Sequence, residues 1–355
     1  MTCGHCGADG PEGPFCARCG AHQGSATATT RVHHFAAAPG EHLAFPAIFS
    51  TLLPQAGRRH ANGFRTLLLA GLALVAVLWA TGIIGIAFIV AALLVPMLYL
   101  VFLRRAEVYR EDPLLILAAT FGGGLVTGTV VTAVAQRLIS TTNGVTTGAL
   151  VALAVVVPLA EEVVKPLPAL ALRNHPRYSE TVDGLTLGIS AGLGFALAEA
   201  AVTFIPVIRS LGLRVDPSNW FVPLTGAALL VPLMQASCTG ILTAALWRTA
   251  RGRAGPVELA GWVIAPVAHM LFAGIAQIAT SSHLEQACVL AGEAIVVVLL
   301  LLFVRLLLHA ALLDEAADLG LERIDCGHCR EHVVAAAFCP RCGAAVPPFL
   351  RRRAT

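Results

Sequence analysis

The stretch TLLLAGLALVAVLWATGIIGIAFIVAALLVPMLYLVFL, residues 66–103, decides the fold class of this chain, because it is long and contains no charged side chain. It is about twice as long as the roughly 20 apolar residues that one helix needs to cross a membrane. The segment ATGIIG near its middle, residues 80–85, supplies a turn. The sequence therefore predicts two membrane-spanning helices joined as a tight hairpin.

Six more apolar stretches of similar length follow along the chain. They are residues 114–135, 147–172, 184–208, 222–247, 259–280 and 286–308. Of the 355 residues, 57% are hydrophobic and 13% are charged, whereas soluble domains carry about 25% charged residues. The chain is therefore predicted to be an all-α polytopic membrane protein with about eight transmembrane helices. The net charge of +3 is too small to favour nucleic acid as a partner.

Arginine residues indicate which side of the membrane each connecting segment faces, because cytoplasmic loops carry an excess of Lys and Arg. The segment before the first predicted span and every second segment after it hold Arg58, Arg59, Arg65, Arg104, Arg105, Arg110, Arg173, Arg177, Arg248, Arg251 and Arg253. The opposite segments hold only Arg137, Arg209 and Arg214. With eight crossings, this bias predicts an integral plasma-membrane protein with both termini in the cytoplasm.

Two short cysteine-rich modules frame the apolar region. One set of ligand-spaced cysteines is Cys3, Cys6, Cys16 and Cys19, and the other is Cys326, Cys329, Cys339 and Cys342. Each set consists of two CxxC pairs, which together supply the closed tetrahedral sulfur site that structural zinc prefers. Redox CxxC pairs or an iron–sulfur site are the alternatives, and the spacing leaves open whether each end binds its own ion.

These signals predict five segments. They are a zinc ribbon at 1–22, a linker at 23–62, the membrane domain at 63–310, a second linker at 311–322 and a second zinc ribbon at 323–346. The zinc would be structural, because four protein ligands leave no open position for a reacting water. The ribbons would recruit partners or regulate the membrane domain.

Charged residues within the predicted spans are functional candidates, since each costs roughly 2.5 to 3.5 kcal/mol at mid-membrane. The segment PLAEEVVKPL, residues 158–167, places Glu161, Glu162 and Lys165 in one apolar helix. Glu199 follows in the next predicted span, and His269 lies two spans further on. We expect all five side chains to face the interior of the bundle or an aqueous cavity rather than lipid.

The order of these motifs resembles the PrsW family of intramembrane proteases, and in outline the CAAX prenyl endopeptidases. The string EEVVK is followed by DGLTLGISAGLGFALAE, which begins at Asp183, and by a later histidine within a span. The resemblance covers residues 153–274. It implies hydrolysis of peptide bonds in membrane-anchored proteins, such as regulators of the anti-sigma-factor type. It also implies that Glu161, Glu162, Lys165, Glu199 and His269 are the matching catalytic positions.

Three positions depart from the pattern of that family. Pro232 stands where the family often has a histidine before a Thr-Gly pair, Ala273 replaces an Asn or Asp, and Ala200 replaces an Asn. A non-catalytic membrane scaffold or receptor that uses its zinc ribbons is therefore one alternative function. A transporter whose buried charges pass ions or protons is another.

Two mechanisms are compatible with the catalytic candidates. In one, Glu161 or Glu162 is the general base for a water molecule, and His269 binds the oxyanion or protonates the leaving amine. In the other, Glu161, Glu162 and His269 hold a catalytic zinc with an open site, although no HExxH string is present.

Ser190 lies in GISAG, which fits the G-x-S-x-G nucleophile pattern. That pattern requires a strand turning into a helix, whereas Ser190 falls inside an apolar span. Gly184, Gly188 and Gly192 make a stripe of small residues there, which indicates close helix packing instead. Gln235 and Glu293 are further polar residues within predicted spans, and the sequence assigns a firm role to neither.

Overall fold

The computed structural model describes residues 62–106, 113–140, 147–212, 221–252, 255–282 and 286–318, together with 323–325, 330 and 332–334. All the cysteines of the two predicted zinc ribbons lie outside these residues, as do the first ribbon and nearly all of the linker 23–62. Zinc binding and the predicted segment boundaries therefore stay predictions.

The chain divides into two compact units. The larger comprises Thr66–Leu100 and Asp112–Val304, and the other comprises Met1–Arg65, Val101–Glu111 and Arg305–Thr355. In the second unit, strands β1 (Arg323–Asp325) and β2 (His332–Val334) pair antiparallel, with Ile324 opposite Val333. This short hairpin falls within the segment predicted as the C-terminal ribbon.

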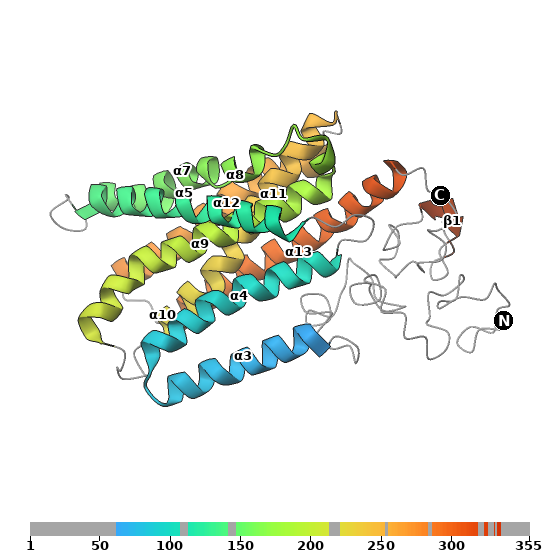
Figure 1. Cartoon of the computed structure of the whole chain (residues 1–355). Coiled ribbons are helices and arrows are strands. Elements are labelled where there is room, and N and C mark those ends of the chain that lie inside the picture. The colour runs from blue at the N-terminus through green and yellow to red at the C-terminus, as the bar shows by residue number, and fades with distance from the viewer. Residues whose placement is uncertain are drawn as a thin grey trace. The chain divides into compact units, whose positions relative to one another are not determined.

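The long apolar stretch forms the predicted hairpin. Helix α3 (Asn62–Ala80) ends at a tight turn, and α4 (Ile84–Ala106) begins after it; Figure 1 shows the two helices joined by this turn. Gly82 adopts a φ of 72° there, a left-handed conformation that glycine adopts at little cost. The backbone N–H groups of Thr81 and Gly82 donate to the carbonyls of Val77 and Trp79, both at 3.0 Å.

Six helices of the described residues are long and apolar enough to cross a membrane. They are Ile84–Leu103 of α4, Leu114–Arg137 of α5 (Leu114–Ser140), Thr181–Ser210 of α9 (Thr181–Leu211), Gly226–Ala250 of η4 (Gly226–Leu230) with α11 (Val231–Ala250), Leu259–Gln277 of α12 (Pro256–Ser282) and Gln286–Leu308 of α13 (Gln286–Asp318). The apolar part of α3, Thr66–Ala80, is shorter. The chain is thus a polytopic helical membrane protein, while the predicted number of eight spans is not confirmed.

The predicted span 147–172 is interrupted, and this is why it does not count as one long helix. It consists of α6 (Thr147–Val151), the π-helical turn η1 (Ala152–Val156), α7 (Val157–Val164) and α8 (Leu167–Leu170). A proline has no N–H, and its ring clashes with the carbonyl four residues earlier. The wider π turn just before Pro158 accommodates that ring, and Pro166 separates α7 from α8.

The same arrangement occurs a second time. Helix α10 (Phe221–Thr225) leads into the π-helical turn η4, and α11 then begins with Val231, Pro232 and Leu233. Helix α7 likewise begins with Val, Pro and Leu after its π turn. Two spans therefore carry the same local distortion at the same place relative to a proline.

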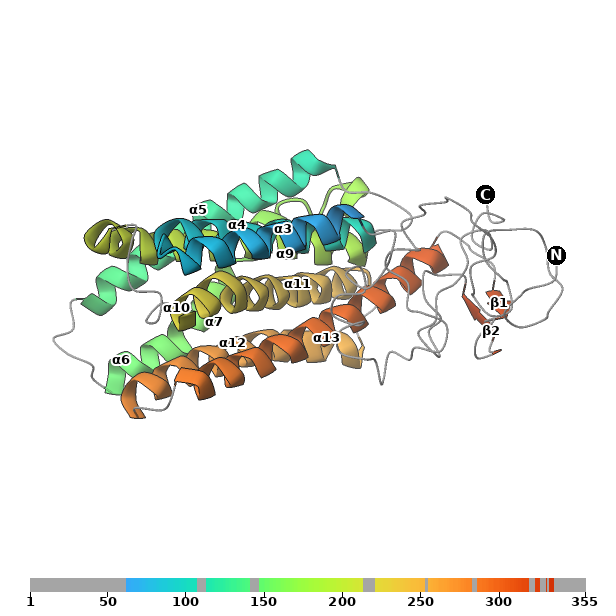
Figure 2. The same cartoon turned by 90° about the horizontal axis from the view of Figure 1, so that it is seen from below.

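Helix α9 packs closely between α5 and α11, and Figure 2 shows α11 in turn between α9 and α12. A Cβ atom at Gly188 would lie 1.8 Å from Thr243 Oγ1, and one at Gly192 would lie 2.8 Å from the carbonyl oxygen of Gln235. On the other side of α9, a Cβ at Gly124 of α5 would lie 2.0 Å from the Ala191 carbonyl oxygen. Small residues let the three helices touch through their backbones, which confirms the predicted packing stripe.

Ser190 takes part in this packing and not in a nucleophile elbow. It is fully buried, and its hydroxyl donates to the carbonyl oxygen of Leu117 on α5 at 2.8 Å. The prediction of a packing role for the GISAG segment is thus confirmed.

An ion pair and a hydrogen bond connect the region before α9 with the end of α11. Glu180 and Asp183 form a capping box at the start of α9, and Arg251, just after α11, forms an ion pair with Glu180. The indole Nε1 of Trp247 donates to the Tyr178 carbonyl oxygen at 2.8 Å. These contacts fix the relative positions of the two helices that carry part of the candidate site.

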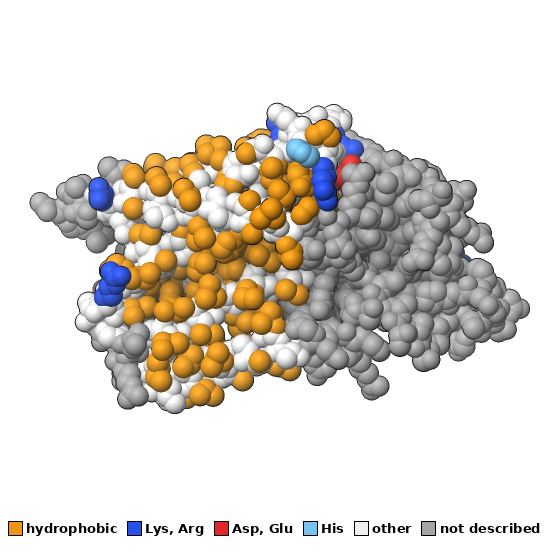
Figure 3. Space-filling view, viewed as in Figure 1, with side chains coloured by type: hydrophobic (Ala, Val, Ile, Leu, Met, Phe, Trp, Pro, Cys, Tyr) orange, Lys and Arg blue, Asp and Glu red, His pale blue; other side chains and the backbone are white. Residues whose placement is uncertain are grey.

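Large apolar side chains cover the outside of the helices. On the face seen in Figure 3, hydrophobic side chains spread across the helical surface, and the visible Lys and Arg side chains lie at its margins. Leu115, Val163 and Leu259 are among the most exposed, at 78%, 72% and 68%. Such a surface suits lipid tails and not water.

Candidate active site

Helix α7 brings the first three charged side chains into the bundle. Glu161 and Glu162 lie in its last turns, and the backbone N–H of Lys165 donates to the Glu161 carbonyl at 2.9 Å, so the helical path continues to Lys165. All three side chains are buried, and Lys165 has no exposed surface. The expectation that these groups face the interior is therefore confirmed.

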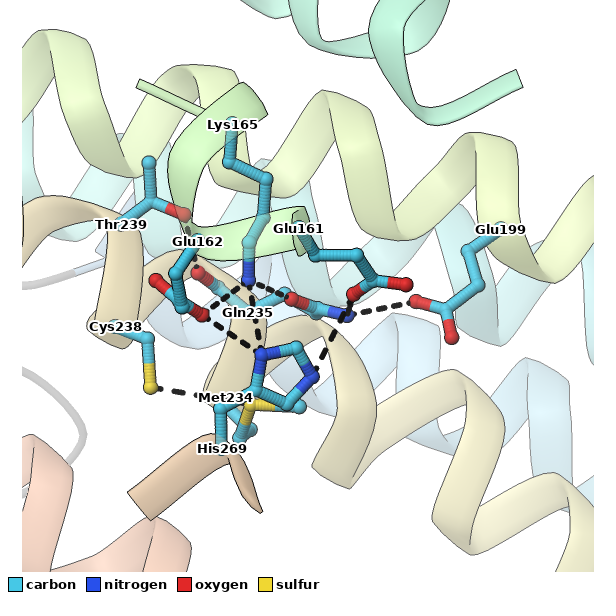
Figure 4. Close-up of polar contacts among 9 residues, drawn as sticks. All are labelled: Glu161, Glu162, Lys165, Glu199, Met234, Gln235, Cys238, Thr239 and His269. Atoms are coloured by element: carbon cyan, nitrogen blue, oxygen red, sulfur yellow. Dashed lines mark hydrogen bonds and ion pairs between the residues drawn. The ribbon is translucent and has the colours of Figure 1, made fainter. Parts of the chain in front are cut away.

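The ammonium group of Lys165 lies at the centre of the cluster, as Figure 4 shows. It donates to Glu162 Oε1 at 2.5 Å and also to the side-chain oxygen of Gln235. It lies 5.6 Å from the centre of the Phe195 ring, within reach of a cation–π interaction. A buried charge needs such partners, since without them it carries its full desolvation cost.

Helix α12 contributes His269, whose two ring nitrogens face two carboxylates. Nδ1 lies 2.8 Å from Glu162 Oε1, and Nε2 lies 3.5 Å from Glu161 Oε2. A carboxylate oxygen accepts, so the hydrogen-bond network assigns the proton to Nδ1. Nε2 then carries a lone pair directed at Glu161.

Helix α9 contributes Glu199, which is the least buried of the five predicted catalytic residues. Its Oε2 accepts a hydrogen bond of 2.8 Å from Gln235 Nε2. Phe195, one turn earlier on α9, contacts Lys165. The structure thus gathers Glu161, Glu162, Lys165, Glu199 and His269 from three helices into one network.

Gln235 of α11 is the site residue that the sequence did not assign. Its amide joins Lys165, Glu161 and Glu199, and its side chain is buried. The available signal was a polar amide in an otherwise apolar stretch of helix. That signal could not distinguish a network residue from an ordinary interhelical hydrogen bond.

Two of the three positions that depart from the family pattern, Pro232 and Ala200, do not take part in the network. Pro232 is in the first turn of α11, so its role is in the π-turn geometry. Ala200 packs in an apolar cluster with Phe88, Ala92 and Ala228. Neither residue forms a polar contact with the carboxylates.

Glu293 of α13 stands apart from the network. It is buried, with 7% of its surface exposed. It makes no hydrogen bond or ion pair with any other residue that the structure describes. Glu293 therefore does not neutralise Lys165.

A bundle of membrane-spanning helices with carboxylates, an imidazole and an ammonium group gathered in its interior defines an integral membrane protein equipped for acid–base chemistry. Residues 112–309, more than half of the chain, match the family described as PrsW family intramembrane metalloprotease. The chain therefore belongs to the PrsW family, and it is an intramembrane protease. No curated protein and no solved structure matches it significantly.

The family description names a metalloprotease, which implies a metal ion bound by side chains of the active site. Their donor types suit zinc. However, the Lys165 ammonium already lies among the donors, 2.5 Å from Glu162 Oε1 and 3.4 Å from His269 Nδ1. The other oxygen of Glu162 is buried without a hydrogen-bond partner, but it is a single donor.

Within the described part of the chain, no group of three His, Cys, Asp or Glu side chains is placed to hold a metal. The side chains in this arrangement therefore do not fit the implied metal.

Proposed function

We propose that this protein hydrolyses peptide bonds of membrane-anchored proteins inside its helical bundle, with Glu161 as general base and His269 as its partner. The observation that carries the proposal is the contact of both α7 carboxylates with one imidazole, at 3.5 Å for Glu161 and 2.8 Å for Glu162. A carboxylate and an imidazole within reach of one another can take up and deliver the protons that amide hydrolysis requires.

Glu161 suits the role of base better than Glu162. Glu162 Oε1 already accepts from Lys165 and His269, and Glu162 Oε2, although it has no hydrogen-bond partner, is fully buried. Glu161 Oε2 accepts from Gln235 at 3.1 Å, whereas its Oε1 has no hydrogen-bond partner among the described residues. That oxygen keeps lone pairs available for a water molecule.

The reaction then proceeds in two proton transfers. Glu161 takes a proton from water as the water oxygen bonds to the carbonyl carbon of the substrate. The tetrahedral intermediate collapses when its nitrogen receives a proton, and the C–N bond breaks to give a carboxylic acid and an amine. Nε2 of His269 faces Glu161 and carries the proton between base and leaving nitrogen.

Lys165 and Glu199 have supporting roles in this scheme. The Lys165 ammonium holds Glu162, which in turn orients the imidazole through Nδ1. Glu199 is only partly buried, and in this scheme water and substrate reach the network on its side. Its carboxylate accepts from the incoming water and directs it toward Glu161.

The two terminal cysteine sets bind structural zinc, and both termini lie in the cytoplasm of a plasma-membrane protein. The arginine distribution and the CxxC spacing support this arrangement. The zinc ribbons would bring the protease to its substrates or regulate it.

A comparison of membrane proteomes tests the proposed function even while the substrate is unidentified. Cells that carry native protein are compared with cells that carry Glu161→Gln, a variant that keeps the shape of the side chain but cannot act as a base. At least one membrane-anchored protein should persist at full length only with the variant. Glu293→Gln, which alters a buried carboxyl group away from the network, is the matched control and should behave like the native protein. Identical proteomes for native protein and Glu161→Gln would contradict the proposal.

A further inference from the structure

Gln235 connects the two carboxylates that lie nearest the proposed water with the central ammonium group. Its Nε2 donates to Glu161 Oε2 at 3.1 Å and to Glu199 Oε2 at 2.8 Å. Its Oε1 accepts from Lys165. One amide group thus links side chains of α7, α9 and α11 (Figure 4).

The orientation of this amide follows from the charges around it. If the amide were flipped, its NH₂ group would face the Lys165 ammonium and its oxygen would face two carboxylate oxygens. All three contacts would then be repulsive, because an ammonium only donates and a carboxylate only accepts. The observed orientation is therefore the one in which every contact is a hydrogen bond.

The main-chain carbonyl group of Gln235 also makes close contacts with its neighbours. The hydroxyl of Thr239 donates to the Gln235 carbonyl oxygen at 2.7 Å. Gly192 of α9 approaches the same carbonyl so closely that a Cβ there would lie 2.8 Å from it. Gln235 is 1% exposed, so the amide has little room to leave its position.

Gln235 also occupies the position in α11 that Glu161 occupies in α7. Each residue comes four positions after the valine of a Val-Pro-Leu sequence, and each of these sequences follows a five-residue π-helical turn. The two residues therefore have the same offset from a π turn, and the hydrogen bond of 3.1 Å between Gln235 Nε2 and Glu161 Oε2 joins their side chains.

From these contacts we infer that Gln235 is a positioning residue for hydrolysis, which holds Glu161 and Glu199 at the separation needed to share one water molecule. This inference rests on the proposed function. Two carboxylates repel each other unless a donor or a cation lies between them. The two N–H groups of Gln235 supply that donor without adding a charge, which leaves the carboxylate of Glu161 able to accept a proton.

Two substitutions of Gln235 test the role in proteoliposomes. Gln235→Met keeps a similar length but removes the donors and the acceptor. Gln235→Glu keeps the shape and the acceptor for Lys165, but places a third carboxylate against Glu161 and Glu199. Ser237→Ala is the matched control, because it removes a buried hydrogen bond of the same helix, 3.1 Å between Ser237 Oγ and Tyr99 Oη, without touching the carboxylates.

The readouts are kcat and KM for a membrane-anchored substrate, together with the thermal unfolding temperature. We expect kcat to fall about 100-fold in both Gln235 variants, the size of effect that misplacement of a reacting group by about 1 Å produces. KM should stay within about two-fold of the native value, and the unfolding temperature of at least one variant should match that of Ser237→Ala. Ser237→Ala should retain native kcat.

The outcomes separate this role from the proposed function. If the native protein hydrolyses the substrate and either folded Gln235 variant keeps kcat within about three-fold of it, the positioning role is overturned and the proposed function stands. If kcat falls only in proportion to the loss of folded protein, Gln235 is structural and the inference is likewise overturned. Lack of hydrolysis by the native protein itself would overturn both.

Discussion

One ammonium group, that of Lys165, is the cation of a network that contains three carboxyl groups. It has no exposed surface, and it lies 2.5 Å from Glu162 Oε1. Helical spacing alone would make both Glu161 and Glu162 its neighbours, at four and three residues' distance. The structure gives the direct ion pair to Glu162, because Gln235 of the neighbouring helix engages Glu161.

Removal of this ammonium should destabilise the protein strongly. Lys165→Met leaves the buried Glu162 carboxylate without its cation, which should cost about 3 to 5 kcal/mol in the free energy of unfolding. The double variant Lys165→Met with Glu162→Gln should regain most of that loss, since neither charge remains, but not the activity. Unfolding in mixed micelles measures both values. A loss of less than about 1 kcal/mol in the single variant would show that the ion pair is not essential.

The sequence indicated most of the network because charges in apolar spans are rare. Glu161, Glu162, Lys165, Glu199 and His269 all stand out in this way, and the structure brings them together. Their catalytic roles remain proposals. Gln235 could not be assigned, because an amide in a membrane span commonly forms an ordinary hydrogen bond between helices and its partners come from other helices.

Between helices, the packing of α9 against α5 and α11 determines whether the network can form. Glu199 and Phe195 lie on α9, Glu161 on α7 and Gln235 on α11. Glycines allow these helices to approach backbone to backbone. The sequence predicted the stripe of Gly184, Gly188 and Gly192, but not the contribution of Gly124 from α5, because partner helices cannot be read from one span alone.

Two glycines of α5 allow a matched test of this packing. A Cβ at Gly124 would lie 2.0 Å from a backbone oxygen of α9, whereas a Cβ at Gly122 would have no neighbour within 4 Å. Gly124→Ala should therefore lower the free energy of unfolding by about 1 to 3 kcal/mol or more, and it should reduce hydrolysis by moving Glu199. Gly122→Ala should leave the free energy of unfolding unchanged or raise it by up to about 1 kcal/mol, because alanine favours a helix more than glycine does. Equal effects of the two substitutions would contradict the proposed packing.

The π-helical turns are the feature of the helices that sequence patterns described least well. The apolar run 147–172 predicted one continuous span, but Pro158 and Pro166 divide it into short helices. Proline signals a distortion without specifying its form, which depends on the neighbouring helices. The recurrence of a π turn before Pro232 became visible only in the structure.

At the scale of the whole molecule, a charged network in an apolar bundle is combined with polar, cysteine-rich ends. The hydrophobic exterior and the family match establish an integral membrane protease. The lengths of the apolar stretches were sufficient to predict a membrane protein, because each stretch must match the thickness of the bilayer. The number of spans was less predictable, since short and interrupted helices share the same composition.

The cysteines near the two ends of the chain are predicted to bind zinc. Purified native protein should contain zinc, and the pair Cys3→Ser with Cys6→Ser should lower the zinc content measured by mass spectrometry, as should the pair Cys326→Ser with Cys329→Ser. Cys288→Ser, an exposed cysteine of α13, is the control and should leave the zinc content unchanged. In inside-out vesicles, the terminal modules should be accessible to impermeant thiol reagents once zinc is removed. A zinc content that neither pair affects would argue against the ribbons.

The most direct measurement is hydrolysis by purified protein in proteoliposomes, with a substrate identified in the proteome comparison and with ¹⁸O-labelled water. The native protein and Glu293→Gln should release two fragments and place one ¹⁸O atom in the new carboxyl terminus. Glu161→Gln and His269→Ala should be folded yet release at least about 100-fold less product. Undiminished release by folded Glu161→Gln protein would contradict the role of the buried carboxylate–imidazole network as the catalytic centre.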